Sequence, residues 1–170
     1  MSLPLYIAGP GVSANTTLLH PTNHLDITAT IVELAGAAPV GPPLDGLSFA
    51  ADLGPSPGAP AAWRDFSFTE HFSNALTWQA IRRPLAAPRT KFTLWCGDDT
   101  MEVFDLDADA WEMVNTAAGA GAALAARELA LAVTLGQCSG AQCSSPAPGK
   151  VPKHHYLVCK NTTKGVEGWW

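Results

Sequence analysis

The sequence predicts an α/β fold in which a short strand and a helix precede a four-stranded antiparallel sheet, itself packed by a helix near the C-terminal end. Three observations predict this fold. Four short apolar segments follow one another at close spacing with turn residues between them, which is typical of an antiparallel meander. A segment with a helical apolar stripe comes before them, and a long alanine- and leucine-rich segment comes after them.

The composition fits one globular domain and excludes several other classes. Of the 170 residues, 47% are hydrophobic and 15% are charged, and the chain holds 15 glycines and 14 prolines. It is too apolar to be disordered throughout, and too rich in glycine and proline for a coiled coil or a long helical bundle. The net charge is −5, so we expect no nucleic-acid partner. We also expect no membrane span, because no apolar stretch reaches the ~18–20 residues that one requires.

The first elements lie in residues 1–60. Residues 3–8 are apolar and end at a Gly-Pro-Gly turn, which predicts a buried strand. Asp26 is a favourable N-cap, and a glycine follows Ala35, so residues 26–35 predict a short amphipathic helix. The apolar stripe of this helix consists of Ile27, Ile31 and Leu34. Residues 37–60 are rich in proline, glycine and alanine and predict a long connector.

The second part of the chain, residues 61–143, contains the sheet and the second helix. The expected strands are residues 66–72, 78–82, 91–96 and 102–106. In the first strand, Phe66, Phe68 and Phe72 alternate with polar residues, which predicts a half-buried strand. Residues 117–135 predict a helix by propensity. Residues 144–170 are rich in serine, proline, glycine and lysine, so we expect a disordered basic tail.

Cysteines and glycosylation motifs favour an oxidising, secretory route. Cys138 and Cys143 stand five apart in a glycine-containing stretch, which favours a local disulfide over a zinc site that would need more ligands. Cys96 and Cys159 remain, either paired with each other or free. Asn-x-Thr triplets at Asn15 and Asn161 are candidate N-glycosylation acceptors.

Two groups of residues are candidates for a functional site. His20, His24 and Asp26 have a spacing that suits a metal, but Pro21 lies between the histidines, so we favour a structural or surface role for them. Glu70 and His71 lie on the first expected strand, Glu70 on its apolar face and His71 on the other. A partly buried acid beside aromatic rings can have a raised pKa, and we consider Glu70 and His71 as substrate contacts.

Aspartates and tryptophans offer two further possibilities. The acidic residues Asp98, Asp99, Asp105, Asp107 and Asp109 lack the glycine and glutamate spacing of a calcium loop. We interpret them as turn formers. The tryptophans can stack on a sugar, but their positions suit core packing equally well. They are Trp63, Trp78, Trp95 and Trp111.

The order of short motifs resembles the C-terminal part of the sulfatase family, within the alkaline phosphatase superfamily, over residues 3 to about 143. Residues 3–11 resemble the strand and turn that follow the last catalytic lysine of that family. Residues 23–36 resemble its Asp-led helix, with Ala29 where a proline is common. Further motifs in family order are Asp45-Gly46-Leu47-Ser48, Trp63-Arg64-Asp65, Glu70-His71, Ala80-Ile81-Arg82, Lys91-Phe92, residues 102–109 and residues 112–115. The Cys138 and Cys143 stretch resembles the closing cysteine pair of glucosamine-6-sulfatase-like and arylsulfatase-like members.

The resemblance implies a domain organisation and a location for the catalytic residues. Residues 1–60 would be the end of the large catalytic domain with its connector, and residues 61–143 the C-terminal subdomain. The family hydrolyses sulfate esters with a formylglycine, made from the cysteine of a Cys-x-Pro-x-Arg motif, and with a Ca²⁺ ion. No cysteine here begins that motif; Cys96 precedes Gly-Asp-Asp-Thr. We therefore expect a truncated chain without catalytic or metal-ligating residues and inactive alone, with those residues upstream of Met1.

The resemblance also implies partners and a location. The substrate of the parent enzyme would be a sulfated carbohydrate or an aryl sulfate, in the secretory pathway and then outside the cell or in a lysosome-like compartment. Two alternatives remain open: a non-catalytic module that contacts carbohydrate or has a structural role, and a fragment of a related phosphodiesterase. The missing nucleophile distinguishes the enzymes, because sulfatases use cysteine and the phosphate enzymes use serine or threonine.

Overall fold

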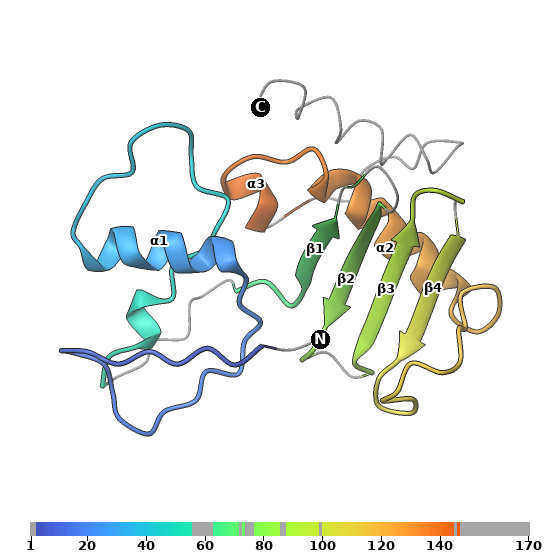
Figure 1. Cartoon of the computed structure of the whole chain (residues 1–170), viewed down its shortest axis with the longest axis horizontal. Coiled ribbons are helices and arrows are strands. Elements are labelled where there is room, and N and C mark those ends of the chain that lie inside the picture. The colour runs from blue at the N-terminus through green and yellow to red at the C-terminus, as the bar shows by residue number, and fades with distance from the viewer. Residues whose placement is uncertain are drawn as a thin grey trace.

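The computed structural model describes residues 3–55, 63–71, 73, 77–85, 88–98, 100–144 and 146. Two parts are distinguished below. The N-terminal region is residues 3–55, and the sheet layer is the described part of residues 66–138. Most of the expected tail lies outside the described residues, as do Phe72, Asp99, Cys159 and Asn161. In Figure 1 the helix of the N-terminal region lies beyond the β1 edge of the sheet.

The expected meander is confirmed. Four antiparallel strands pair in the order β1-β2-β3-β4, so each strand lies next to its neighbour in sequence. Each of the four expected strands of the meander lies within two residues of an observed one at the ends that the structure describes. The strands are β1 (Ser67–His71), β2 (Trp78–Arg83), β3 (Thr90–Trp95) and β4 (Thr100–Asp105).

Helix α2 (Ala122–Leu135) packs against one face of the sheet and forms the core with it (Figure 1). Residues that alternate along each strand point toward this helix, as pleating requires. The cluster includes Phe66, Ile81, Phe92, Leu94 and Val103 from the sheet side and Ala125, Leu129, Ala132 and Leu135 from the helix. All of its members lie in residues 66–138, and none comes from the N-terminal region.

Helix α2 begins later than expected, because residues 117–121 form a turn. The amides of Gly119 and Gly121 both donate to the carbonyl of Thr116. A Cβ at Gly121 would lie 2.6 Å from the Thr116 hydroxyl and 2.9 Å from a methyl group of Val103. The close approach of this turn to the sheet therefore requires glycine, and the helix starts only after it.

Helix α1 (His24–Leu34) begins two residues before the expected start. The N-cap is Asn23, and the prediction of Asp26 as N-cap was wrong. Asp26 occupies the third helical position, where its carboxylate accepts a hydrogen bond from the Asn23 amide at 2.7 Å. That contact is the return half of a capping box, which an acidic residue three places after the N-cap makes possible.

Two expectations for the N-terminal region were wrong. Residues 3–8 form no strand, and their side chains are exposed, because no described strand lies beside them to complete a ladder. Helix α1 also exposes much of its apolar stripe: Ile31 and Leu34 are each 60% exposed. Its buried residues are instead Asp26, Ala29 and Thr30. They face the connector that runs from α1 to the 3₁₀ helix η1 (Ala50–Asp52), where the Thr30 hydroxyl accepts a hydrogen bond from the Phe49 amide at 3.1 Å.

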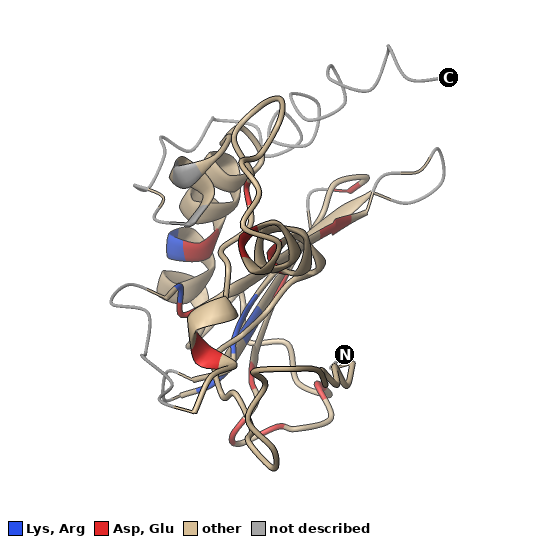
Figure 2. Ribbon diagram, turned by 90° about the vertical axis from the view of Figure 1, so that its left-hand side faces the viewer, with Lys and Arg blue, Asp and Glu red and all other residues tan. Residues whose placement is uncertain are grey.

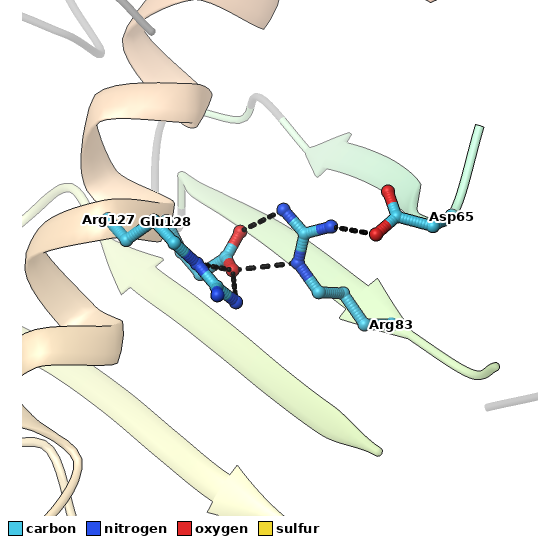
Figure 3. Close-up of polar contacts among 4 residues, drawn as sticks. All are labelled: Asp65, Arg83, Arg127 and Glu128. Atoms are coloured by element: carbon cyan, nitrogen blue, oxygen red, sulfur yellow. Dashed lines mark hydrogen bonds and ion pairs between the residues drawn. The ribbon is translucent and has the colours of Figure 1, made fainter. Parts of the chain in front are cut away.

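An ion network joins α2 to the sheet (Figure 3). Glu128 of α2 is buried and accepts hydrogen bonds from Arg83 of β2 at 2.8 and 3.2 Å. Arg83 also donates to Asp65 at 2.6 Å, and Arg127 donates to Glu128. Charged residues elsewhere are interspersed along the ribbon (Figure 2). The network stabilises the register of α2, since a buried carboxylate requires its cation.

Candidate functional site

The face of the sheet that α2 leaves uncovered, here called the open face, has three rows of side chains. The strand register sets His71, Trp78, Trp95 and Thr100 side by side at one end. Thr69, Ala80, Thr93 and Glu102 form the middle row, and Ser67, Arg82, Lys91 and Phe104 the other end. The His71 and Trp78 rings stack with centroids 6.0 Å apart.

A groove of about 1060 Å³ lies between this face and the N-terminal region. Its sheet wall includes Trp78, Ala80, Thr93 and Trp95. Its second wall consists of residues 3–7 and of side chains between residues 12 and 53, among which apolar residues are frequent. Below it is called the open groove. It is a large, open concavity lined by described residues, and it is therefore a candidate for a binding site.

The charges in the open groove balance. Arg82 and Lys91 line it, and so do Asp52 and Glu102. Lys91 is already paired with Glu112. Within the described part of the chain, Arg82 makes no ion pair. The formal charges of these four residues therefore sum to zero, although Arg82 and Lys91 lie side by side in the strand register.

His20 and Asp52 form a pair at the edge of the open groove. The His20 Nε2 atom lies 2.9 Å from an Asp52 carboxylate oxygen, and both side chains are largely buried. Trp63 covers the imidazole with ring centroids 4.1 Å apart and donates from its indole nitrogen to the Pro21 carbonyl at 2.7 Å. These contacts tie the segment that leads into β1 to the N-terminal region.

The His20, His24 and Asp26 spacing assembles no metal site in the structure. Asp26 is fully buried and paired with Arg64, and it also accepts the Leu47 amide at 2.8 Å. His20 bonds to Asp52 instead, and His24 is exposed. The structural role that we favoured for Asp26 is observed. It holds helix α1, the following turn and the segment that leads into β1 in one hydrogen-bonded unit.

Glu70 and His71 lie on opposite faces of β1 and do not converge. Neither lines the open groove, and both side chains are exposed. Partial burial beside the core raises the pKa of the Glu70 carboxyl above its ordinary value of 4.5. A substrate contact by Glu70 or His71 stays a prediction, since their placement alone does not define a pocket.

The described aspartates between positions 98 and 109 serve as turn formers. The Thr100 hydroxyl donates to Asp98 at 2.8 Å, and this bond lowers the pKa of the Asp98 carboxyl. Asp107 accepts the backbone amide and guanidinium of Arg89, which lower its pKa. Trp111 is 87% exposed, whereas Trp78 and Trp95 line the open groove.

The Cys138–Cys143 disulfide is present with an S–S distance of 2.04 Å, which confirms that prediction. No cysteine among the described residues is free. Asn15 is exposed and has a positive φ of 56°, which asparagine adopts more readily than most residues. Its glycosylation stays a prediction, and Asn161 lies outside the described residues.

The open groove was missed by the sequence analysis. The alternation of Trp78, Ala80 and Arg82 with the buried Gln79 and Ile81 was the signal for a second sheet face. The partner of that face lies in residues 3–53, far away in sequence, and pattern alone does not reveal such a pairing. The Asp26–Arg64 pair was missed for the same reason.

The cofactors implied by the resemblance do not fit the residues present. No cysteine begins a Cys-x-Pro-x-Arg motif that could yield formylglycine. The described residues contain no cluster of three or more histidine, cysteine or acidic side chains able to hold a metal ion. No reaction step is therefore assigned to side chains of this chain.

Comparisons with known proteins support a relationship to sulfatases. The chain is 35% identical to a choline-sulfatase from Rhizobium meliloti (strain 1021) over 120 residues, which cover 68% of this chain and 21% of the choline-sulfatase. No protein-family model matches the chain. No helix among the described residues is long and apolar enough to cross a membrane.

Two solved structures share the fold. One is a Bacteroides thetaiotaomicron VPI-5482 protein assigned as a sulfatase, with a TM-score of 0.59 and 24% identity over 86% of this chain and 34% of that one. The other is a 2-O GAG sulfatase, with a TM-score of 0.54 and 24% identity over 84% and 33%. This chain thus spans about a third or less of each of these three proteins. The chain is related to the sulfatases and carries a part of their sequence and fold.

Proposed function

We propose that this chain is the C-terminal part of a sulfuric ester hydrolase and that it supplies structure rather than reacting groups. The observation that carries the proposal is the 35% identity to choline-sulfatase over 120 residues, which make up only 21% of that enzyme. The sequence supports the second half of the proposal, because it contains no formylglycine motif. The nucleophile and the metal ligands of the parent protein then come from outside these 170 residues.

The remaining features of the parent protein follow from the same relationship. Formylglycine and Ca²⁺ would act in the complete enzyme, on a sulfated carbohydrate or an aryl sulfate. The Cys138–Cys143 disulfide and the exposed Asn15 acceptor support a secretory route, with an extracellular or lysosome-like destination. The alternatives predict otherwise: a carbohydrate-contacting module would bind glycan without any enzyme, and a phosphodiesterase would use serine or threonine.

Two activity measurements test the proposal. The purified 170-residue chain, assayed with an aryl sulfate and Ca²⁺, is expected to show no turnover; calcium-dependent turnover would overturn the claim that it lacks reacting groups. A chimeric Rhizobium choline-sulfatase, with this chain in place of its 120 matched residues, is expected to hydrolyse sulfate esters. A folded chimera that cleaves phosphodiesters and no sulfate ester would favour the phosphodiesterase alternative.

A further inference from the structure

The Cys138–Cys143 disulfide closes a short ring directly after helix α2. The two cysteines are five residues apart, and both keep part of their surface exposed to solvent. A disulfide opens when a thiolate attacks one of its sulfur atoms, so the exchange requires access of this kind. The ring is therefore a place where the redox state of the surroundings can act on the fold.

The ring contacts the connector that runs from α1 to η1. Gly140, inside the ring, is buried, and its amide donates to an Asp45 carboxylate oxygen at 2.6 Å. A Cβ at Gly140 would lie 2.8 Å from the Cβ of Pro43, so the ring fits closely against the connector. Gly140 has a φ of 60°, which glycine adopts without steric cost. The closed ring thus presents one backbone amide to one carboxylate that lies 95 residues away in the sequence.

Asp45 begins the turn of the connector that is hydrogen-bonded to helix α1. The Leu47 amide donates to the Asp26 carboxylate at 2.8 Å. The Phe49 amide donates to the Thr30 hydroxyl at 3.1 Å. Both acceptors belong to buried residues of α1. The contacts therefore form one series, which leads from the end of α2 through the ring and the connector to α1.

The reduced form of Cys138 has a hydrogen-bond acceptor within reach. The Cys138 Sγ atom lies 3.2 Å from the carbonyl oxygen of Leu135, the last residue of α2. In the disulfide this sulfur carries no proton and cannot donate. A thiol at the same position can donate, and it would satisfy one of the carbonyls that a helix end leaves without an internal partner. Opening the ring therefore weakens the Asp45 contact but supplies a donor to the end of α2.

We propose that the Cys138–Cys143 disulfide is a redox-sensitive clasp that holds the connector, and through it α1, to the end of α2. Two molecules of glutathione open the clasp. The sulfur–sulfur bond breaks, each cysteine takes one proton and becomes a thiol, and the two glutathiones leave as one glutathione disulfide. The ring then loses its covalent restraint and no longer holds the Gly140 amide against Asp45. The connector is released, while the sheet layer keeps its own core. The clasp is independent of sulfate ester hydrolysis.

A redox titration of the whole chain tests the coupling between the ring and Asp45. The chain is equilibrated in glutathione buffers, alkylated and digested, so that mass spectrometry separates the Cys138 and Cys143 thiols from that of Cys96, which is also disulfide-bonded. If the closed ring strengthens the Asp45 contact, loss of that contact must make the ring easier to reduce by the same factor. Asp45→Ala is therefore expected to raise the ratio of reduced to oxidised ring about fivefold, which is what one typical hydrogen bond contributes. Asp45→Asn keeps an acceptor oxygen and should stay close to the wild type. An unchanged ratio in Asp45→Ala would overturn the proposal.

Native-state hydrogen exchange measures what the clasp holds. The variant Cys138→Ser/Cys143→Ser lacks the bridge in the absence of any reductant, and it puts hydroxyl donors where reduction would put thiols. The amides of the turn at residues 45–49 are expected to exchange about fivefold faster than in the wild type, while β2 and β3 exchange at an unchanged rate. Addition of Asp45→Ala should cause no further increase, because both changes break the same contact. Equal protection of the turn with and without the bridge, or a loss of protection in the strands as well, would overturn the proposal.

Discussion

The sheet layer and the N-terminal region differ in how they bury their apolar residues. The sheet layer has its own core, in which one face of four strands and one face of α2 cover each other. The N-terminal region buries polar groups, among them His20 with Asp52, and Asp26 with Arg64 of the segment before β1, and it exposes much of its apolar surface. The N-terminal region therefore forms helix α1 and its hydrogen-bonded turns although many of its hydrophobic side chains are not buried.

This contrast explains why the two regions should respond differently to mutation. A region with its own hydrophobic core unfolds as a cooperative unit, whereas segments with few buried apolar contacts can open separately. Substitutions in the sheet layer should therefore lower global stability. Substitutions in the N-terminal region should release that region and leave the sheet folded.

The largest global effect is expected for Glu128→Ala. The substitution leaves Arg83 largely buried beside an empty site, with only the exposed Asp65 as its acid. Removal of one partner of a buried pair costs about 3–5 kcal/mol. Urea unfolding followed by circular dichroism measures the loss. Asp65→Ala is the control, because Asp65 is 59% exposed and its pair is worth at most about 1 kcal/mol. Equal losses would contradict the assignment of Glu128 as the central acid.

An effect of the same size, but local, is expected for Asp26→Ala. The change leaves the Arg64 guanidinium buried and removes the acceptor of the Asn23 and Leu47 amides. The opening free energy of α1 should fall by about 3–5 kcal/mol. Native-state hydrogen exchange should show faster exchange in residues 24–34 and unchanged exchange in β2 and β3. An equal loss of exchange protection in β2 and β3 would show that the two regions unfold together.

Gly46→Ala is expected to have a smaller effect in the N-terminal region. A Cβ at residue 46 would lie 2.1 Å from the Leu25 carbonyl oxygen and 2.4 Å from its carbon, so α1 must move away. Overpacking of this kind costs about 1–3 kcal/mol. Limited proteolysis measures the effect, because residues 3–55 should be cleaved faster once α1 has moved away. Gly54→Ala, where nothing lies within 4 Å of the new atom, should behave as wild type.

The smallest effect is a pH dependence carried by Glu70 of the sheet layer. Burial raises its folded pKa above 4.5, so the folded state binds the proton more tightly than the unfolded state does. The stability contributed by Glu70 is therefore greatest at low pH and falls as pH rises above that value. Glu70→Gln should flatten this fall, measured by urea unfolding at about pH 4 and about pH 7. An identical pH dependence of stability in the wild type and in Glu70→Gln would contradict this role of Glu70.

The accuracy of the sequence analysis follows the same division. The four strands and their order were recovered from short apolar segments, because hairpin neighbours pair through nearby residues. The start of α2 was placed too early because alanine propensity outweighed the two glycines at positions 119 and 121. For α1 the apolar stripe was recognised, but the structure leaves Ile31 and Leu34 of this stripe each 60% exposed.

The amino-acid sequence by itself determined the strand order, the Cys138–Cys143 bridge and the resemblance to sulfatases. These features depend on residues that are close in the sequence or on the order of motifs, and both can be read from the sequence. Only the tertiary structure decided that Asp26 pairs with Arg64, that Glu128 holds Arg83, and that the open face of the sheet meets the N-terminal region in a groove. Each of those contacts joins residues far apart in the chain, and burial determines which of several equally suitable partners meet.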